Sequence, residues 1–310
     1  MPSRPDLESS VSKLKRGAKR SGALVRAVRA TYPALSWIEN RPAVYLRQAP
    51  YLARMRFDDV RLGGRGNEPE AHLRRTARLH ALQGSDILVV GAGRGDELDL
   101  WSQQRPRSLT AVEYLDHASD WHARPEASFA RMDARTLAFA PASFDVVAST
   151  ALLEHIDGVD AAMREMARVV RPGGVIFANF GPLYCTYGGA HYDGAYEHLA
   201  MSDAELERYL VQRNIPGELE DGLVWVRNGM FSKLRYDEYL AIFERYFHLE
   251  HVTLAVSPPA MRFRRERPSE WRYLTARYDE ADLLTYAMTV WLRPLPVALS
   301  SRRRQRGAAA

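Results

Sequence analysis

The feature that most constrains the fold is an apolar run that passes directly into a cluster of glycines. Residues 87–97 read ILVVGAGRGDE, so a predicted buried strand turns sharply at Gly91, Gly93 and Gly95 before a helix begins. Glycine lets the backbone turn tightly and lets a ligand approach without a Cβ in the way. The N-terminus of the following helix attracts carboxylates and phosphates. The segment therefore predicts a ligand-binding loop at the end of a strand in an α/β protein.

Further apolar runs alternate with predicted helices along the chain. They cover residues 109–112, 144–148 and 175–180, and later strands are predicted at 251–256 and 285–292, with a helix at 236–246 before them. Short apolar strands separated by helices indicate βαβ units and a parallel sheet that is buried on both faces. We predict a doubly wound α/β fold in which the last two strands close the sheet as an edge pair.

Charge is distributed unevenly. Residues 1–50 carry ten Lys/Arg against three Asp/Glu, and residues 261–310 carry eleven against five. Because the net charge of the whole chain is +5, residues 51–260 carry a net charge of −8. We predict a basic helical extension over residues 1–69, a core domain over 70–300 with a cap at about 183–247, and a disordered basic tail over 301–310. The basic ends are either solvated or contact phosphates of nucleic acid or anionic lipid.

Composition narrows the setting of the protein. No apolar run approaches the eighteen residues of a membrane-spanning helix, and the basic N-terminus lacks the apolar stretch of a secretory signal. The single cysteine, Cys185, excludes an internal disulfide and fits a reducing cytoplasm. We therefore expect a cytoplasmic protein.

The acids around the glycine loop argue against a dinucleotide site. Counted from Gly91, the position of the third glycine in the G-x-G-x-x-G fingerprint is occupied by Asp96, whose negative charge would repel a pyrophosphate. A ligand that carries an amino group and a sulfonium tolerates that acid. Glu113 follows the next apolar run, 22 residues after Gly91, where a carboxylate can accept hydrogen bonds from ribose hydroxyls.

Four segments together resemble the class I S-adenosylmethionine-dependent methyltransferases, in particular the broad group that includes many bacterial small-molecule and glycan methyltransferases. The segments are residues 87–97, 109–114, 131–156 and 165–180, and the resemblance covers about residues 70–182, with a looser match over 183–293. It implies a Rossmann-like, mostly parallel sheet of seven strands with an antiparallel edge strand. It also implies S-adenosylmethionine as the cofactor.

The resemblance further implies a set of cofactor contacts. In it the glycines line the methionine part, Glu113 holds the ribose, and Asp133 accepts from the adenine amino group. Asp96 pairs with the ammonium group, a role that Glu97 can share. The implied contact residues are Gly91, Ala92, Gly93, Asp96, Glu113, Asp133, Ala134, Thr150 and Ala151.

The acceptor side is predicted from the segment GPLYCTYGGAHYDGAYEH at residues 181–198. Aromatic rings with imidazoles suit a sugar or another polyhydroxylated acceptor, whose hydroxyl needs a general base. We predict His191 as that base, with Tyr184 and His198 as catalytic neighbours, the alternative being a lid whose aromatic side chains only pack. For His155 we expect a role in starting or orienting a helix, with catalysis as the alternative.

These features favour O-methylation of a hydroxyl on a sugar-containing or natural-product small molecule, including a glycan or a lipid-linked sugar. N-methylation of a small amine stays open as an alternative. Modification of nucleic acid is disfavoured because no known nucleic-acid module is present. Weak membrane contact through residues 11–30 is a further possibility. No metal is expected, because the residues after the two central strands are Ser149 and Asn179. The arginines between the last two predicted strands, expected in a loop that is solvated or binds a phosphate, are Arg262, Arg264, Arg265 and Arg267.

Overall fold

The structure is a computed structural model that describes residues 51–52, 54–62, 69–115, 121, 124–220 and 222–296. All of these belong to one compact unit, Tyr51–Ala310. The predictions of membrane contact through residues 11–30 and of a disordered tail at 301–310 fall outside the described residues, as does most of the helical extension predicted over residues 1–69.

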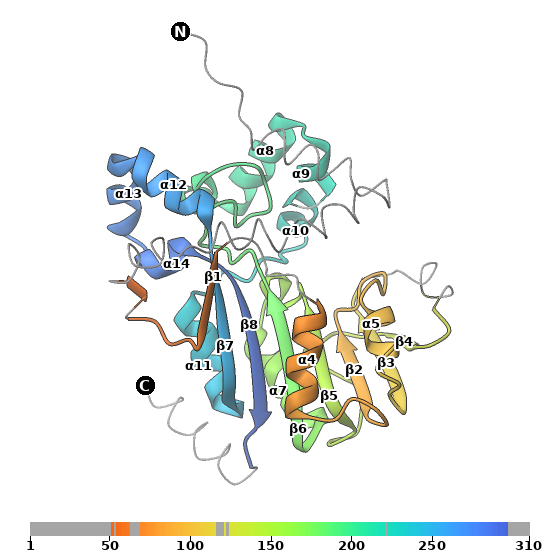
Figure 1. The fold of residues 1–310 in the computed structure, drawn as a ribbon. Helices are drawn as coiled ribbons and strands as arrows, with labels where there is room; N and C mark the ends of the chain where they lie inside the picture. The colour runs from red at the N-terminus through yellow and green to blue at the C-terminus, as the bar shows by residue number, and fades with distance from the viewer. Residues whose placement is uncertain are drawn as a thin grey trace, which may run out of the picture. The chain divides into compact units, whose positions relative to one another are not determined.

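The described strands form one eight-stranded sheet in the order β1-β7-β8-β6-β5-β2-β3-β4 (Figure 1). Every neighbouring pair is parallel except the two that involve β8. The strands are β1 (Asp59–Leu62), β2 (Asp86–Val90), β3 (Ser108–Glu113), β4 (Ser128–Arg131), β5 (Phe144–Thr150), β6 (Val170–Phe180), β7 (Phe247–Val256) and β8 (Thr285–Pro294).

The α/β doubly wound prediction is confirmed, and two of its details are wrong. The sheet has eight strands instead of seven because Asp59–Leu62, which the sequence assigned to a helical extension, pairs with β7 as an edge strand. The antiparallel strand β8 lies inside the sheet between β6 and β7, so it is not an edge strand.

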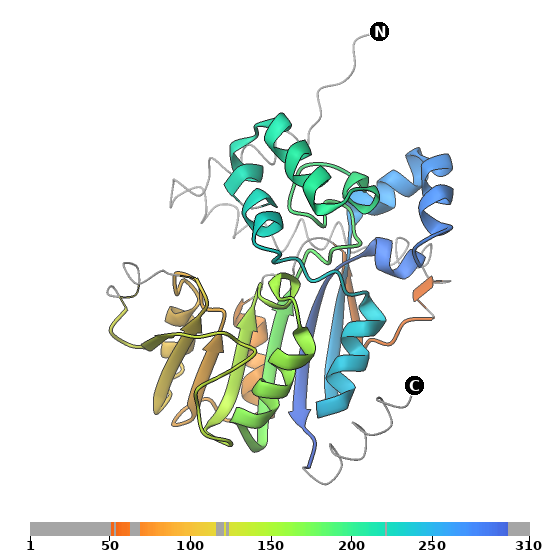
Figure 2. The same ribbon diagram turned by 180° about the vertical axis from the view of Figure 1, so that it is seen from behind.

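Helices cover both faces of the sheet because its central strands are apolar on both sides. In β2, residues Ile87, Leu88, Val89 and Val90 are all buried. The helices α4 (Pro69–Leu79) and α5 (Leu98–Ser102) pack into the core on one face. The helices α7 (Val159–Val169) and α11 (Tyr236–Tyr246) pack into the core on the other (Figures 1 and 2).

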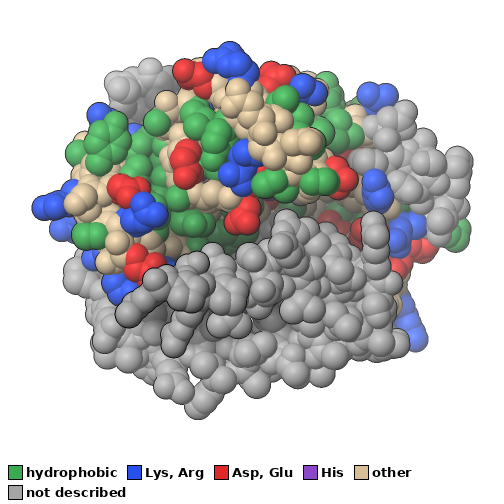
Figure 3. Space-filling model, turned by 90° about the horizontal axis from the view of Figure 1, so that it is seen from above, with side chains coloured by type: hydrophobic (Ala, Val, Ile, Leu, Met, Phe, Trp, Pro, Cys, Tyr) green, Lys and Arg blue, Asp and Glu red, His purple; other side chains and the backbone are tan. Residues whose placement is uncertain are grey.

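Further helices lie beyond the carboxyl ends of the parallel strands (Figure 1). We call α8 (Asp203–Arg213), α9 (Pro216–Glu220) and α10 (Gly222–Arg227) the helical cap; they pack on one another and on the segment that follows β6. From above, the described surface carries side chains of both charges among hydrophobic ones (Figure 3). No helix among the described residues is both long and apolar enough to cross a membrane.

The segment between β7 and β8 is helical, which corrects the predicted loop. It forms α12 (Pro258–Glu266), α13 (Pro268–Thr275) and α14 (Glu280–Leu284). Arg262, Arg264 and Arg265 lie on α12, which starts at a Pro258–Pro259 pair behind the capping hydroxyl of Ser257. Proline suits the first turn of a helix because its missing N–H has no partner there.

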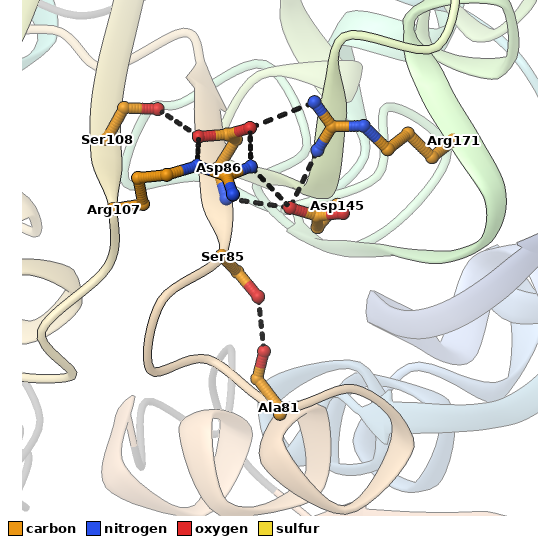
Figure 4. A network of polar contacts seen from close by, with 7 residues as sticks. All are labelled: Ala81, Ser85, Asp86, Arg107, Ser108, Asp145 and Arg171. Carbon is orange, nitrogen blue, oxygen red and sulfur yellow. Dashed lines mark hydrogen bonds and ion pairs between the residues drawn. The ribbon is translucent and has the colours of Figure 1, made fainter.

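A polar network ties the amino ends of the central strands together, at the edge opposite the glycine loop (Figure 4). Asp86 accepts hydrogen bonds from Arg107, one of them at 2.9 Å, from Arg171 at 2.9 Å and from the Ser108 hydroxyl at 2.8 Å. Arg171 also pairs with Asp145 at 2.7 Å. The Arg107 guanidinium holds the pKa of Asp86 well below its usual range, so the network is charged at neutral pH.

Candidate functional site

The glycine loop connects β2 to α5 with three residues in the left-handed region. The φ angles are 76° at Gly91, 53° at Gly93 and 86° at Gly95. A Cβ at Gly91 would lie 2.8 Å from the Leu152 side chain, so no larger residue fits there. A Cβ at Gly93 would meet no atom of the described residues within 4 Å, so its backbone borders open space there.

Glu113 at the end of β3 fixes this loop. Its Oε2 accepts from the Gly93 N–H at 2.9 Å, and its Oε1 accepts from the N–H groups of Tyr114 and Leu115 at 2.7 and 2.9 Å. The side chain is buried. The carboxylate is therefore held at the point where the ends of β2 and β3 meet.

A cleft of about 360 Å³ lies at these carboxyl ends, where the strand order reverses: β3 and β4 follow on one side of β2, and β5 lies on its other side. Ligands of open α/β sheets bind at this kind of topological switch point. Seven of the nine predicted cofactor residues line the cleft, whereas Asp133 and Ala134 do not. The lining residues are Gly91, Ala92, Gly93, Arg94, Asp96, Glu97, Glu113, Leu115, Thr150, Ala151, Leu152, His155, Trp225 and Met230.

The two predicted residues outside the lining follow β4. Asp133 accepts from the Arg135 guanidinium at 2.7 Å and from the Arg135 backbone N–H at 2.8 Å. These bonds lower its pKa, the Arg135 side chain being the main cause. Ala134 is buried. The adenine contacts assigned to these two residues stay predictions.

The two adjacent acids of the loop differ in their surroundings. The Asp96 side chain is 88% exposed and pairs with Arg124 at 3.2 Å. Glu97 is half-buried in the cleft and is hydrogen-bonded to the Thr150 side chain. Burial raises the pKa of Glu97 to about 7. A cation in the cleft is therefore better placed to pair with Glu97 than with Asp96.

Opposite the glycine loop, the wall of the cleft combines His155 with two residues from the segment around α10. The ring of His155 stacks on Trp225, with 4.0 Å between the ring centroids and 20° between the planes. Its Nδ1 lies 3.1 Å from the carbonyl oxygen of Met230. Because a carbonyl only accepts, Nδ1 carries the proton, and Nε2 holds the lone pair of the neutral ring.

Sequence reasoning missed Trp225 and Met230 and gave His155 a structural role. Trp225 lies about seventy residues after β5 in a stretch without a motif, so no local signal places it at the cleft. His155 belongs to the 3-10 turn Leu153–His155 that follows β5. Its place directly after a parallel strand is the signal in the sequence that could have assigned it to the cleft.

The three predicted catalytic residues lie behind this wall and are not among the described residues that line the cleft. His191 is closest, with its ring 4.7 Å from that of His155 and a backbone φ of 59°. Tyr184 is buried, and burial raises the pKa of its hydroxyl. Their catalytic roles stay predictions.

His198 is fully buried and held on both ring nitrogens. Its Nε2 donates to the Tyr184 carbonyl at 2.7 Å, and its Nδ1 lies 3.2 Å from the Tyr192 hydroxyl. Burial lowers its pKa to about 4, so the ring is neutral at pH 7. Among the described residues, no three His, Cys, Asp or Glu side chains gather as metal ligands.

Comparison with known families agrees with this geometry. Residues 88–178, from β2 to β6, match the family model of the methyltransferase domain. The chain carries a class I S-adenosylmethionine-dependent methyltransferase domain. S-adenosylmethionine is accordingly its cofactor, and the chain is a methyltransferase. A search of curated proteins gives no match.

Solved structures similar to this methyltransferase come from several different organisms. One is an S-adenosylmethionine-dependent methyltransferase from Mesorhizobium loti, 19% identical over 74% of this chain and 100% of its own, with a TM-score of 0.47. Another is the YcgJ protein of a Bacillus, 14% identical over 73% and 97%, with a TM-score of 0.44. A third is phosphoethanolamine N-methyltransferase 2 from Haemonchus contortus, 16% identical over 72% and 52%, with a TM-score of 0.43.

Proposed function

We propose that this methyltransferase methylates a hydroxyl oxygen of a neutral small molecule with a flat face, such as a sugar-containing or aromatic natural product. The observation that carries the proposal is the division of charge in the cleft. Among the described lining residues, the charged side chains all come from the glycine loop and the end of β3. The opposite wall consists of His155, Trp225 and Met230, which suits an uncharged ring.

The residues of the glycine-loop side fit the cofactor. Gly93 borders open space where a Cβ would stand, and the Oε2 atom of the buried Glu113 carboxylate has one lone pair for a ribose hydroxyl beyond its bond to the Gly93 N–H. Glu97 is placed to pair with the ammonium group. When bound, S-adenosylmethionine supplies a methyl group made electrophilic by its sulfonium sulfur.

His155 is our candidate for the general base. The Met230 carbonyl fixes the proton on Nδ1, so Nε2 can take the acceptor's hydroxyl proton as oxygen bonds to the methyl carbon and the carbon–sulfur bond breaks. The stacked Trp225 ring limits rotation of the imidazole. In this assignment His191 supports His155 from behind, and His198 and Tyr184 form the packed base of the wall.

Two alternatives have less support. An amine acceptor whose lone pair is free needs no base to accept the methyl group. The fixed tautomer of His155 would then have no role in the reaction. Nucleic acid needs a basic surface, but Arg264, Arg265 and Arg267 are paired with Glu280, Glu266 and Glu270.

The test is turnover of S-adenosylmethionine by the full chain with panels of neutral glycosides and phenols, small amines, and oligonucleotides, with methylated products identified by mass. We expect product only from neutral hydroxyl compounds. His155→Gln should lower kcat about 100-fold or more, whereas His248→Gln, an exposed histidine on β7, should not. Methylation of amines or oligonucleotides alone would refute the proposal.

A further inference from the structure

The tip of the segment after β6 holds its histidine in an unusual backbone conformation. His191 has a φ of 59°, in the left-handed backbone region that residues other than glycine rarely adopt. The tip is closed by hydrogen bonds from Gly188 N–H to the Ala195 carbonyl at 2.9 Å and from His191 N–H to the Gly188 carbonyl at 3.0 Å. Such a conformation persists only where neighbouring structure fixes it.

An ion pair between the buried Glu218 and the half-buried Arg213 in the helical cap fixes this tip. Arg213 of α8 donates to both carboxylate oxygens of Glu218 of α9, each at 2.7 Å. Glu218 Oε1 also accepts from the Asp193 N–H at 2.9 Å, and Arg213 donates to the Asp193 carbonyl at 2.8 Å. The pair therefore binds both backbone groups of Asp193, two residues after His191.

The other side of the tip is closed by α10. A Cβ at Gly222 would lie 2.8 Å from the Ala190 carbonyl oxygen and 3.2 Å from that of His191, so the helix packs directly on this backbone. The same helix carries Trp225, which stacks on His155. The tip thus sits between the ion pair and the helix that builds the acceptor wall.

We infer that Arg213 and Glu218 are positioning residues of the acceptor site: by holding the Asp193 backbone they seat the His191 ring against His155. The described contacts of the ion pair outside itself are with Asp193, Tyr192 and Tyr209, none of which lines the cleft. Its effect therefore falls on acceptor turnover and leaves cofactor binding intact. The inference rests on the proposed function for its kinetic consequence, and its structural consequence is independent of catalysis.

The test compares Glu218→Ala and Glu218→Gln with Glu207→Ala in the full chain. Glu207 is a matched control because it pairs with Arg227 at 2.8 Å within the same cap, and no described contact joins it to the tip. Glutamine keeps an oxygen that can accept from the Asp193 N–H. The readouts are hydrogen exchange of residues 188–195, the histidine ring NMR signals of His191 and His155, acceptor kcat/KM, and affinity for S-adenosylhomocysteine.

For Glu218→Ala we expect faster exchange of residues 188–195, displaced ring signals and a loss of about tenfold or more in acceptor kcat/KM. Cofactor affinity should stay within about twofold. Glu218→Gln should recover part of the loss, and Glu207→Ala should match the wild type. If Glu218→Ala does not fold, Arg213→Lys and Glu218→Gln provide the same readouts.

Unchanged exchange and ring signals in the Glu218 variants would overturn the inference. So would altered exchange with unchanged acceptor kinetics in an active enzyme. If the wild type methylates no hydroxyl compound, the proposed function fails, and exchange with ring signals still decides whether the ion pair seats His191.

Discussion

The carboxylate of Glu113 accepts a hydrogen bond from the backbone N–H of Gly93 at 2.9 Å. This bond joins the end of β3 to the loop after β2, so a side chain suited to hold the ribose also shapes the loop that borders the rest of the cofactor. The proposed recognition of the ribose is therefore coupled to the geometry of the glycine loop through one buried carboxylate.

Replacing Glu113 with Ala should consequently weaken S-adenosylhomocysteine binding about 100-fold, since a hydrogen bond from a ribose hydroxyl to a charged group is lost together with the bond that holds the Gly93 N–H. Titration calorimetry measures the change. Asp99→Ala is the control, because Asp99 is an exposed acid on α5 that pairs with Arg124 outside the cleft lining. An equal loss in both variants would indicate a general effect of charge and contradict the assignment.

Cofactor affinity should also depend on pH through Glu97. Its pKa is raised to about 7 by burial, so at pH 6 the carboxyl is mostly protonated and cannot pair with an ammonium group. Affinity for S-adenosylhomocysteine should rise from pH 6 to pH 8 as the carboxylate forms, and binding at pH 7 should release a proton. Calorimetry in buffers of different ionisation enthalpy detects that proton. Glu97→Gln should remove both effects, and a wild-type affinity that is flat over this range would count against the pairing.

The glycine-loop side of the cleft, which we propose to hold the cofactor, could be predicted as a part of the fold because its signals are local. The glycines lie next to an apolar strand, and Glu113 ends the following strand, so the alternation of strands and helices brings them together. Asp96 and Glu97 show the limit of that reasoning. Both stand at the start of a helix, and only packing leaves one exposed and the other half-buried.

The acceptor half and the sheet edge depend on contacts between distant segments. Trp225 reaches the cleft through the packing of α10 on the segment after β6. β1 has four residues and pairs with a strand about 190 residues later, so nothing in its own sequence marks it as part of the sheet. The sequence predicts a loop where α12, α13 and α14 lie, because the charged residues of this segment outnumber the apolar ones that face the core.

His198 should make the fold sensitive to acid. Its pKa falls from about 6.5 in the unfolded chain to about 4 when buried, so the unfolded state binds the proton first. The stability from this residue is complete above pH 6.5 and is lost as the pH falls toward 4, by at most about 1.4 kcal/mol per pH unit.

Urea unfolding at several pH values between 4 and 7 checks this, with His198→Gln compared to the wild type. The variant should show a shallower loss of unfolding free energy with falling pH. It should retain the loss of unfolding free energy that His72 causes as the pH falls. His72 is a second buried histidine, and burial lowers its pKa to about 4. Parallel pH profiles for variant and wild type would contradict the prediction.

Substitution of Trp225 should impair acceptor recognition and leave cofactor binding almost unchanged. Its ring is half-buried, stacks on His155 at 4.0 Å and borders the cleft, so it orients the base and offers a flat surface to the acceptor. An aromatic pair contributes about 0.5–1.5 kcal/mol beyond burial. Trp225→Ala should therefore lower acceptor kcat/KM by about two- to tenfold, and Trp225→Phe should retain most of it. Steady-state kinetics at saturating S-adenosylmethionine measures both, with Val224→Ala, an exposed neighbour on α10, as control. Because the acceptor wall and the glycine loop are separate sides of the cleft, S-adenosylhomocysteine affinity should change little in either variant. A loss of cofactor affinity equal to the loss of acceptor turnover would place Trp225 on the cofactor instead.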